Sequence, residues 1–284
     1  MNRLGQHFLK NKAVIKRMVA ALEIKPKETI LEVGPGHGEL TIPLARTCEK
    51  KNCKILSIEK DEKLAGELEF KIKNFGLNKV VKIVRDDALR FVKNFPKSEI
   101  SAKANQLRRN FSEVMLRRGK LNPKSSYKIV GNIPFYITGR LLRYIGELKS
   151  KPSICVFTLQ KEVAERLTAK PPKMNRLASS VQLWAEAKII AYISKTDFKP
   201  KPEVDAAVVV LKTEMSAAAT KNSEKILKAL FAQPRKTILN NLANPQVKKS
   251  KEEIAKILEK IGVNPQNRPQ DLSIEDIIRL SRLI

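Results

Sequence analysis

The sequence has few of the residues that bind metal ions or form disulfides. It contains only three cysteines, Cys48, Cys53 and Cys155, and only two histidines, His7 and His37. The cysteine count is odd and no CxxC spacing occurs, so neither a disulfide framework nor a zinc site is expected. We therefore predict reduced, partly buried thiols and no metal centre.

Long apolar runs are also missing. No stretch approaches the roughly 20 apolar residues that a membrane-spanning helix needs, and the first residues lack the apolar core of a signal peptide. A mitochondrial presequence is the alternative for this end of the chain, but the segment continues directly into motif-bearing residues. These absences favour a cytoplasmic protein without a membrane partner.

Acidic residues are scarce relative to basic ones. The 284 residues include 56 Lys and Arg against 29 Asp and Glu, which gives a net charge of +27. An excess of this size implies a polyanionic partner, with nucleic acid as the first candidate and a membrane surface as the second. The hydrophobic content of 42% is enough for a core, and the length suits one large domain plus a small one.

Short apolar strands and amphipathic helices alternate through the first part of the chain. Helices are expected at 13–23 and 61–74, and further helical stretches follow the first and fifth strands. This alternation is typical of an α/β fold with a parallel sheet covered on both faces. The six predicted strands are 29–33, 54–58, 80–84, 128–130, 154–159 and 206–211.

The pattern changes after the last of these strands. Residues 214–221 are rich in Ala, Ser and Thr, which indicates a linker, and helix signals replace strand signals beyond them. We predict two domains, 1–212 and 213–284, of which the second is small and all-helical. Two capping boxes, each ahead of an apolar helical run, are expected there. The candidates are Ser250 with Glu253 and Ser273 with Asp276.

Residues 97–126 separate the third and fourth predicted strands by far more chain than a crossover needs. Leu107, Phe111, Val114 and Met115 fall on one face of a helix. Two interpretations stay open and are compatible. The segment is a surface helix packed through its apolar stripe, or an added basic element that contacts RNA beside the active site.

Chemically useful residues stand where predicted strands end. Glu32 to Gly38 reads EVGPGHG, a turn whose glycines let the backbone approach a ligand. Glu59 follows Gly38 by 21 residues, where a carboxylate can bind ribose hydroxyls. Asp87 ends the third strand, where it can accept an adenine amino hydrogen, and Asn132 ends the fourth. Because ligands bind outside the carboxyl ends of parallel strands, these positions predict one crevice.

Each position has a plainer interpretation when taken alone. The glycine turn can be a simple turn, Glu59 a solvated acid beside Lys60 and Lys63, and Asp87 a helix cap. Their joint spacing favours the crevice. A dehydrogenase-type phosphate site is disfavoured, because the glycines are not in the order GxGxxG.

The hexapeptide Gly131–Tyr136, GNIPFY, follows the fourth strand and suits the binding of an exocyclic amine on a flat heterocycle. The Asn132 side-chain carbonyl and a backbone carbonyl can accept the two amine hydrogens. The ring of Phe135 can stack on the base. The turn therefore predicts a site for a nucleobase amine.

With these motifs in place, the sequence resembles the small-subunit ribosomal RNA adenine dimethyltransferase family, the kasugamycin-resistance methylases and their eukaryotic counterparts. The resemblance covers nearly the whole chain. It implies a Rossmann-like class I S-adenosylmethionine-dependent methyltransferase fold with a small all-helical C-terminal domain. The matching segments are 4–9, 32–38, 57–59, 87–88, 131–136, 159–163, 198–205 and 231–237.

The resemblance also implies an activity: two methylations of each of two adjacent adenines in the 3′-terminal hairpin loop of small-subunit rRNA, at the stage of an immature subunit, by a monomer. The expected catalytic residues are Asn132, Phe135 and Phe198. The residues expected to hold S-adenosylmethionine are His7, Leu9, Gly34, Glu59, Asp87 and Asn132. Candidates for RNA phosphate contacts are Arg140, Arg143, Arg235 and Lys236, for each of which ordinary surface charge is the plainer interpretation.

The chain departs from the family pattern in places. His7 stands where Asn is frequent, Phe135 where bacterial members commonly have Tyr, and Pro234 where a basic residue is common. The segment 97–126 is longer than usual.

Two other functions stay open. One is a large-subunit rRNA adenine methylase of the macrolide-resistance type, which shares the NIPF segment; the run 159–163 and the basic C-terminal motif argue against it. The other is a ribosome-assembly factor that binds RNA without catalysis. The complete set of Glu59, Asp87 and Asn132 argues against that second alternative.

Overall fold

The computed structural model describes residues 6–94, 127–213, 221–245, 247 and 249–284. The basic segment predicted at 97–126 lies outside the described residues. Contacts between residues divide the chain into two compact units, Met1–Lys161 with Ile190–Leu211, and Glu162–Ile189 with Lys212–Ile284. The domain boundary expected after residue 212 stays a prediction, because a unit defined by contacts is not a functional domain.

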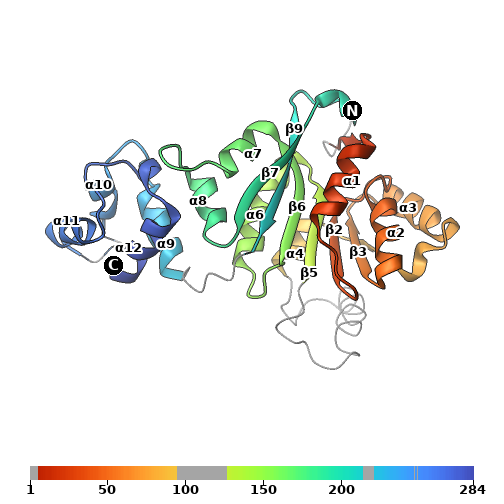
Figure 1. Cartoon of the computed structure of the whole chain (residues 1–284), viewed down its shortest axis with the longest axis horizontal. Coiled ribbons are helices and arrows are strands. Elements are labelled where there is room, and N and C mark those ends of the chain that lie inside the picture. Colours follow the sequence, from red (N-terminus) through yellow and green to blue (C-terminus); the bar gives the residue numbers. More distant parts are fainter. Residues whose placement is uncertain (1–5, 95–126, 214–220, 246, 248) are drawn as a thin grey trace. The chain divides into compact units, whose positions relative to one another are not determined.

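A seven-stranded sheet forms the first unit's centre, in the order β4-β3-β2-β5-β6-β9-β7 (Figure 1). The pairs β2–β3, β3–β4, β2–β5 and β5–β6 are parallel. All six predicted strands are confirmed with small shifts of their ends. The strands are β2 Thr29–Val33, β3 Lys54–Glu59, β4 Val81–Arg85, β5 Tyr127–Asn132, β6 Ile154–Gln160, β7 Glu186–Ile193 and β9 Ala206–Lys212.

The chain order reverses between β2 and β5, which lie side by side although β3 and β4 come between them in sequence. Gly131 allows this close pairing, since a Cβ there would lie 2.5 Å from the carbonyl oxygen of Val33. A crevice at such a reversal is where α/β sheets bind ligands. The fold thus places the predicted site residues at one edge of the sheet.

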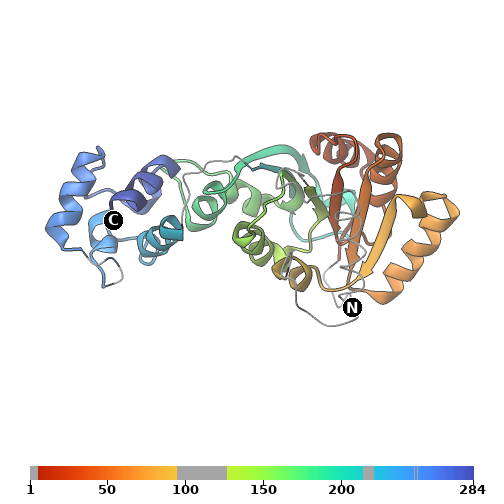
Figure 2. The same ribbon diagram turned by 90° about the horizontal axis from the view of Figure 1, so that it is seen from below.

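Helices cover both faces of the sheet. Helices α1 (Lys12–Ala21), α2 (Thr41–Lys51) and α3 (Glu62–Asn74) share one apolar cluster with the inner residues of the strands. In Figures 1 and 2, α1 and α2, in red, lie on the opposite side of the sheet from α6 (Thr138–Glu147), in yellow-green. Helix α4 (Ala88–Lys93) contacts α6. Both faces of the sheet are covered, as predicted, and β4, β3, β2, β5 and β6 are parallel, but the expectation of a wholly parallel sheet is wrong because the seven-stranded sheet is mixed.

A short antiparallel pair lies apart from the main sheet. Strand β1 (Phe8–Leu9) pairs with β8 (Phe198–Lys199), so that Leu9 faces Phe198 across the ladder. The sequence did not predict β1, β7 or β8. Two-residue strands have too little length for a periodic signal, and β7 alternates only partly between buried and exposed residues.

The second unit is helical, apart from the first part of β7, and has an apolar core of its own. This core combines residues from the segment 174–183 with residues from the segment 226–280. Ser250 and Ser273 both form the capping boxes that the sequence predicted. Its helices are α7 Lys161–Leu167, whose first residue falls in the first unit, α8 Arg176–Gln182, α9 Lys221–Leu230, α10 Ile238–Leu242, α11 Lys251–Lys260 and α12 Ile274–Leu283.

The three cysteines are free, as predicted, but they are fully rather than partly buried. Cys48, in α2, and Cys53 belong to the apolar cluster of the first unit, and Cys155 lies in strand β6. Among the described residues, no group of three or more His, Cys, Asp or Glu side chains is arranged to hold a metal ion. No helix in the described part is long and apolar enough to cross a membrane.

Candidate active site

The turn after β2 requires its glycines. The backbone φ angles of Gly34, Gly36 and Gly38 are +67°, +55° and +92°, values that residues with a side chain rarely adopt. A Cβ on Gly36 would also lie 2.6 Å from the ring of Phe8, and one on Gly38 would lie 2.6 Å from Leu68. The turn therefore has no room for a side chain at Gly36 or Gly38.

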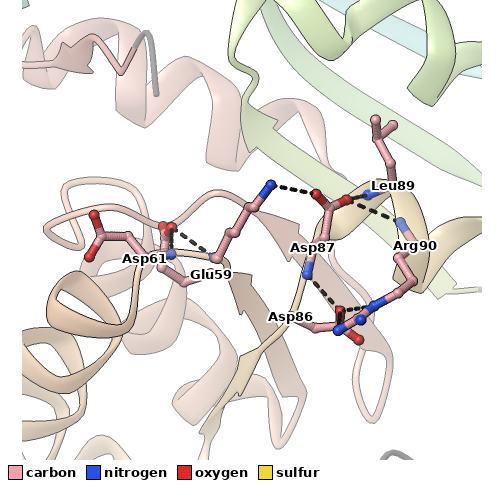
Figure 3. Close-up of polar contacts among 7 residues, drawn as sticks. Glu59, Asp61, Asp86, Asp87, Leu89 and Arg90 are labelled. Atoms are coloured by element: carbon pink, nitrogen blue, oxygen red, sulfur yellow. Dashed lines mark hydrogen bonds and ion pairs between the residues drawn. The ribbon is translucent and has the colours of Figure 1, made fainter. Parts of the chain in front are cut away.

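Glu59, the last residue of β3, is buried and fixed by backbone donors. Its Oε2 accepts from the N–H of Gly36 (3.1 Å), and its Oε1 accepts from Lys60 (2.9 Å) and Asp61 (3.0 Å). Figure 3 shows the contact between Glu59 and Asp61 at the strand end. A carboxylate has about four acceptor positions, so Glu59 keeps capacity for one further donor from a ligand. Its plainer interpretation as a solvated acid is wrong, because the residue is only 4% exposed.

Asp87 follows β4 and caps α4, which is the plainer role considered from the sequence. Its Oδ1 accepts from the N–H groups of Leu89 (2.9 Å) and Arg90 (3.2 Å). Its Oδ2 lies 3.0 Å from Lys60 Nζ (Figure 3). Burial raises the pKa of Asp87, but Lys60 and the two backbone donors outweigh it, so that its pKa lies below the ordinary value. The cap uses Oδ1 only, so it does not exclude the binding of a ligand through Oδ2.

Asn132, at the end of β5, is tied to the N-terminal segment. Its Nδ2 donates to the backbone carbonyl of His7 at 2.6 Å. The His7 ring donates from Nδ1 to the carbonyl of Pro200 at 2.8 Å, so the ring is turned toward the segment after β8. The contact of His7 with Asn132 is thus through its backbone. The bond fixes the amide of Asn132 and with it the direction of its side-chain carbonyl.

Aromatic rings lie beside Asn132. Phe135, in the 3₁₀ turn Phe135–Ile137, and Phe198, in β8, both line the pocket that Asn132 lines. The ring centroid of His7 lies 6.0 Å from that of Phe135. Tyr136, the next residue, is 56% exposed. The structure therefore brings together the three residues predicted to hold a target base.

Two adjoining pockets contain these groups. One is lined by Asn132, Phe135 and Phe198, and the other by Lys60, Asp87 and neighbouring residues. Leu9 lines a third small pocket together with Asn132. The first two pockets share part of their lining and therefore adjoin each other. The residues that line both are Gln6, Gly34, Glu59 and Pro134.

A buried acid connects β2 with the start of α2 and with β3. Glu32, in β2, accepts hydrogen bonds from Thr41 Oγ1 (3.0 Å) and Ser57 Oγ (2.6 Å). Burial raises its pKa to about 7. The side chain thus connects the start of α2 with β3, and it lines neither pocket.

The four basic residues predicted to contact RNA are all exposed but belong to different units. Arg140 and Arg143 lie on α6 in the first unit, where Arg143 stands 5.0 Å from the ring of Tyr144. Arg235 and Lys236 lie in the second unit, just before α10. Their RNA contacts stay predictions.

Comparison with known proteins decides the family. The profile described as "Ribosomal RNA adenine dimethylase" matches residues 1–284. The chain belongs to this family. A relative from Dehalococcoides mccartyi, "Ribosomal RNA small subunit methyltransferase A", is 32% identical over 96% of the chain and 84% of its own length. Relatives of the same name from Listeria innocua and Lactobacillus acidophilus are 31% and 33% identical, over 99% of the chain and 89% and 90% of theirs.

Solved structures confirm the class I methyltransferase fold. A dimethyladenosine transferase from Plasmodium falciparum has a TM-score of 0.74 at 21% identity and covers 96% of each chain. The 23S rRNA methyltransferase ErmE has a TM-score of 0.70 at 22% identity, covering 97% of this chain and 98% of its own. At these identities the likeness establishes the fold alone. The family membership makes the chain an S-adenosylmethionine-dependent rRNA adenine dimethyltransferase, as the sequence predicted.

The pocket fits that cofactor. The glycine turn has no room for side chains at Gly36, and Glu59 and Asp87 supply carboxylate oxygens at neighbouring strand ends. Sequence reasoning missed Lys60 and Tyr136, which line the pocket beside Asp87. Both are adjacent in sequence to predicted site residues, and this adjacency was the only signal that could have identified them.

Proposed function

We propose that the chain dimethylates N6 of two adjacent adenines in the 3′-terminal hairpin loop of small-subunit rRNA, within an immature small ribosomal subunit. The names of the relatives at 31–33% identity support the choice of subunit. The observation that carries the proposal is that Asn132 lines one pocket together with Phe135, Phe198 and Glu59, and that Glu59 also lines the pocket of Asp87. We further propose that the protein acts in the cytoplasm as a monomer.

The proposed cofactor contacts follow the two adjoining pockets. Glu59 would accept from the ribose hydroxyls and Asp87 Oδ2 from the amine of the cofactor's adenine. Gly34 lines both pockets, and a Cβ there would meet only two protein atoms, both at 3.8 Å or more. The space beside its backbone is therefore open to the cofactor. His7 would contribute its backbone, because its ring is held by Pro200. Leu9 would border the methyl-donor end, where it shares a pocket with Asn132.

Bound S-adenosylmethionine supplies an electrophilic methyl group on a sulfonium. Asn132 would accept one hydrogen of the target amine through its side-chain carbonyl. The second hydrogen would go to the backbone carbonyl of Ile133 or Pro134; that of Pro134 already accepts from Ile137 N–H at 3.1 Å, which leaves it one lone pair. These bonds favour a tetrahedral amine and aim its lone pair. Positioning and preorganised dipoles then supply the rate. The C–S bond would break as the N–C bond forms, S-adenosylhomocysteine would leave, and the methylated nitrogen would lose its proton to solvent after transfer, so that no dedicated base is needed.

Phe135 and Phe198 would enclose the target base between them. Phe198 is 5% exposed, and its partner in the ladder is Leu9, so its position is fixed by packing. Phe135 is half-buried at the mouth of the same pocket. A base in a hairpin loop is unstacked at low cost, and stacking between two rings compensates for that cost.

The substrate's backbone would be met by basic residues of both units. Arg140 and Arg143 lie on one exposed face of α6, the helix that follows Asn132 in the chain. Arg235 and Lys236 present exposed charge in the second unit. Phosphate contacts of this kind give affinity and register rather than sequence specificity.

Separate methylation of unmodified small and large ribosomal subunits tests the choice of substrate. The chain with labelled S-adenosylmethionine should label small-subunit rRNA and leave large-subunit rRNA unlabelled. Label confined to the large subunit would support the macrolide-resistance type instead. Binding of small-subunit particles without any label would favour the non-catalytic assembly factor.

A further inference from the structure

Lys60 occupies a place in the pocket for which neither the sequence motifs nor the proposed contacts assign a role. It follows β3, and its Nζ lies 3.0 Å from Oδ2 of Asp87, which follows β4. Both side chains line the pocket that also includes Glu59, Ala88 and Tyr136. Their side chains are 58% and 36% exposed, so a ligand can reach both.

The two oxygens of Asp87 are not equivalent. Oδ1 is committed to the cap of α4 through the N–H groups of Leu89 and Arg90 (Figure 3). Oδ2 is therefore the oxygen that a ligand in the pocket meets, and Lys60 Nζ stands beside it. A base edge that approaches Asp87 thus finds an acceptor and a donor next to each other.

This pairing changes which base the pocket can bind. An ionised carboxylate only accepts hydrogen bonds, so alone it selects an exocyclic amine and repels an exocyclic carbonyl oxygen. An ammonium group has three donors, and one of those on Lys60 is directed at Asp87. A 6-aminopurine presents a donor amine beside acceptor ring nitrogens, and a 6-oxopurine presents an acceptor oxygen beside a donor N1–H. The two edges carry donor and acceptor in reversed order, so the group at position 6 decides the partner: an amine there donates to Oδ2 of Asp87, whereas an oxygen there accepts from Lys60 Nζ beside it.

We propose that Lys60 sets the base specificity of the cofactor pocket, by forming with Asp87 a donor–acceptor pair that binds the 6-aminopurine of the cofactor and also tolerates a 6-oxopurine. The inference rests on the proposed placement of the cofactor's base beside Asp87. Each partner stabilises the charged form of the other. The hydrogen bond and charge of Asp87 raise the pKa of Lys60, and the pKa of Asp87 lies below its ordinary value even though burial raises it.

Titration calorimetry of the full chain with S-adenosylhomocysteine and S-inosylhomocysteine tests this inference. Lys60→Met keeps the apolar stem and removes the donor. The variant should bind the inosyl compound more weakly. The dissociation constant of S-inosylhomocysteine divided by that of S-adenosylhomocysteine should therefore increase by about fivefold or more, as expected for the loss of one hydrogen bond. Lys60→Arg keeps donors and should leave the ratio near that of the wild type.

Lys63→Met is the matched control, because Lys63 is an exposed lysine in the first turn of α3 and does not line the pocket. It should not change the ratio. An unchanged ratio in a folded Lys60→Met variant would overturn the inference and leave the cofactor assignment intact. Failure of the wild type to bind S-adenosylhomocysteine at all would instead overturn the placement of the cofactor, and this inference with it.

Discussion

The side-chain amide of Asn132 donates to the backbone carbonyl of His7 at 2.6 Å, across 125 residues of sequence. The bond joins the end of β5 to the segment that enters β1, and both residues line one pocket. An Asn amide that can flip presents either a donor or an acceptor to a ligand. Because Nδ2 is held by His7, Oδ1 is the atom that remains for a target amine.

Asn132→Ala should lower the rate of methylation by roughly 100-fold to 1,000-fold, as removal of one preorganised hydrogen-bonding group does in other enzymes. RNA affinity should stay close to that of the wild type, since the proposed phosphate contacts lie elsewhere. Single-turnover methylation together with an RNA-binding assay measures both quantities. Asn240→Ala, at an exposed position of α10, serves as the control and should match the wild type. Unchanged methylation in Asn132→Ala would contradict the assigned role.

Gly36→Ala should weaken cofactor binding by roughly tenfold or more. The new Cβ would meet the ring of Phe8 at 2.6 Å, and the backbone at φ +55° is strained for alanine. Gly66→Ala is the matched control, because Gly66 lies inside α3 with nothing within 4 Å of its Cβ position. It should stabilise the fold by about 0.5–1 kcal/mol and leave cofactor affinity unchanged. Equal cofactor affinity in both variants would disprove the requirement for glycine in the turn.

Glu32 should make stability depend on pH. Burial raises its pKa from 4.5 to about 7 in the folded chain. The folded state therefore binds the proton more tightly than the unfolded state, and this stability is fully present below about pH 4.5 and is lost as the pH rises toward 7. The loss amounts to about 3 kcal/mol at most.

Glu32→Gln keeps an uncharged, hydrogen-bonding side chain at this position and should remove that dependence. Urea unfolding at a series of pH values should show the variant gaining stability relative to the wild type between pH 4.5 and 7. A constant difference across this range would mean that Glu32 titrates at an ordinary pKa.

The first unit also contains a buried ion pair. Lys128 Nζ lies 2.7 Å from Glu28 Oε2, with side chains 2% and 8% exposed. Lys128→Met leaves a buried carboxylate without its counterion and should destabilise the fold by about 3–5 kcal/mol.

Adding Glu28→Gln to Lys128→Met should recover much of that loss, because the charge left behind is removed as well. Lys82→Met, at an exposed position of β4, is the control and should change stability by less than about 0.5 kcal/mol in urea unfolding. A double variant as unstable as the single one would show that the pair matters through packing rather than charge.

The sequence predicted the sheet well because apolar strands and glycine turns are local signals. The strand 29–33 was predicted with both its ends, and the capping boxes at Ser250 and Ser273 formed as expected. The pairing of β1 with β8 was missed, since it depends on residues about 190 positions apart. Glu59, Asp87 and Asn132 were brought to adjoining pockets because parallel strands end at one edge.

What the sequence did not predict are the contacts that modify those residues. The bond from Asn132 to the backbone of His7 and the ion pair of Asp87 with Lys60 both depend on tertiary geometry. The family motif includes His7 but does not indicate whether its ring or its backbone carbonyl group makes the contact. The positions of the RNA-contacting residues stay predictions for the same reason.

Nucleotide-resolution mapping of modified adenines in small-subunit rRNA tests whether the chain dimethylates two adjacent adenines and whether Asn132 is required. Unmodified small subunits are incubated with S-adenosylmethionine and either the wild-type chain or Asn132→Ala, and the rRNA is analysed by mass spectrometry of defined fragments. We expect N6,N6-dimethyladenosine at two adjacent positions of the 3′-terminal hairpin loop with the wild type, and at neither position with the variant. Dimethylated adenines at other positions only, or an equal yield from Asn132→Ala, would contradict this expectation.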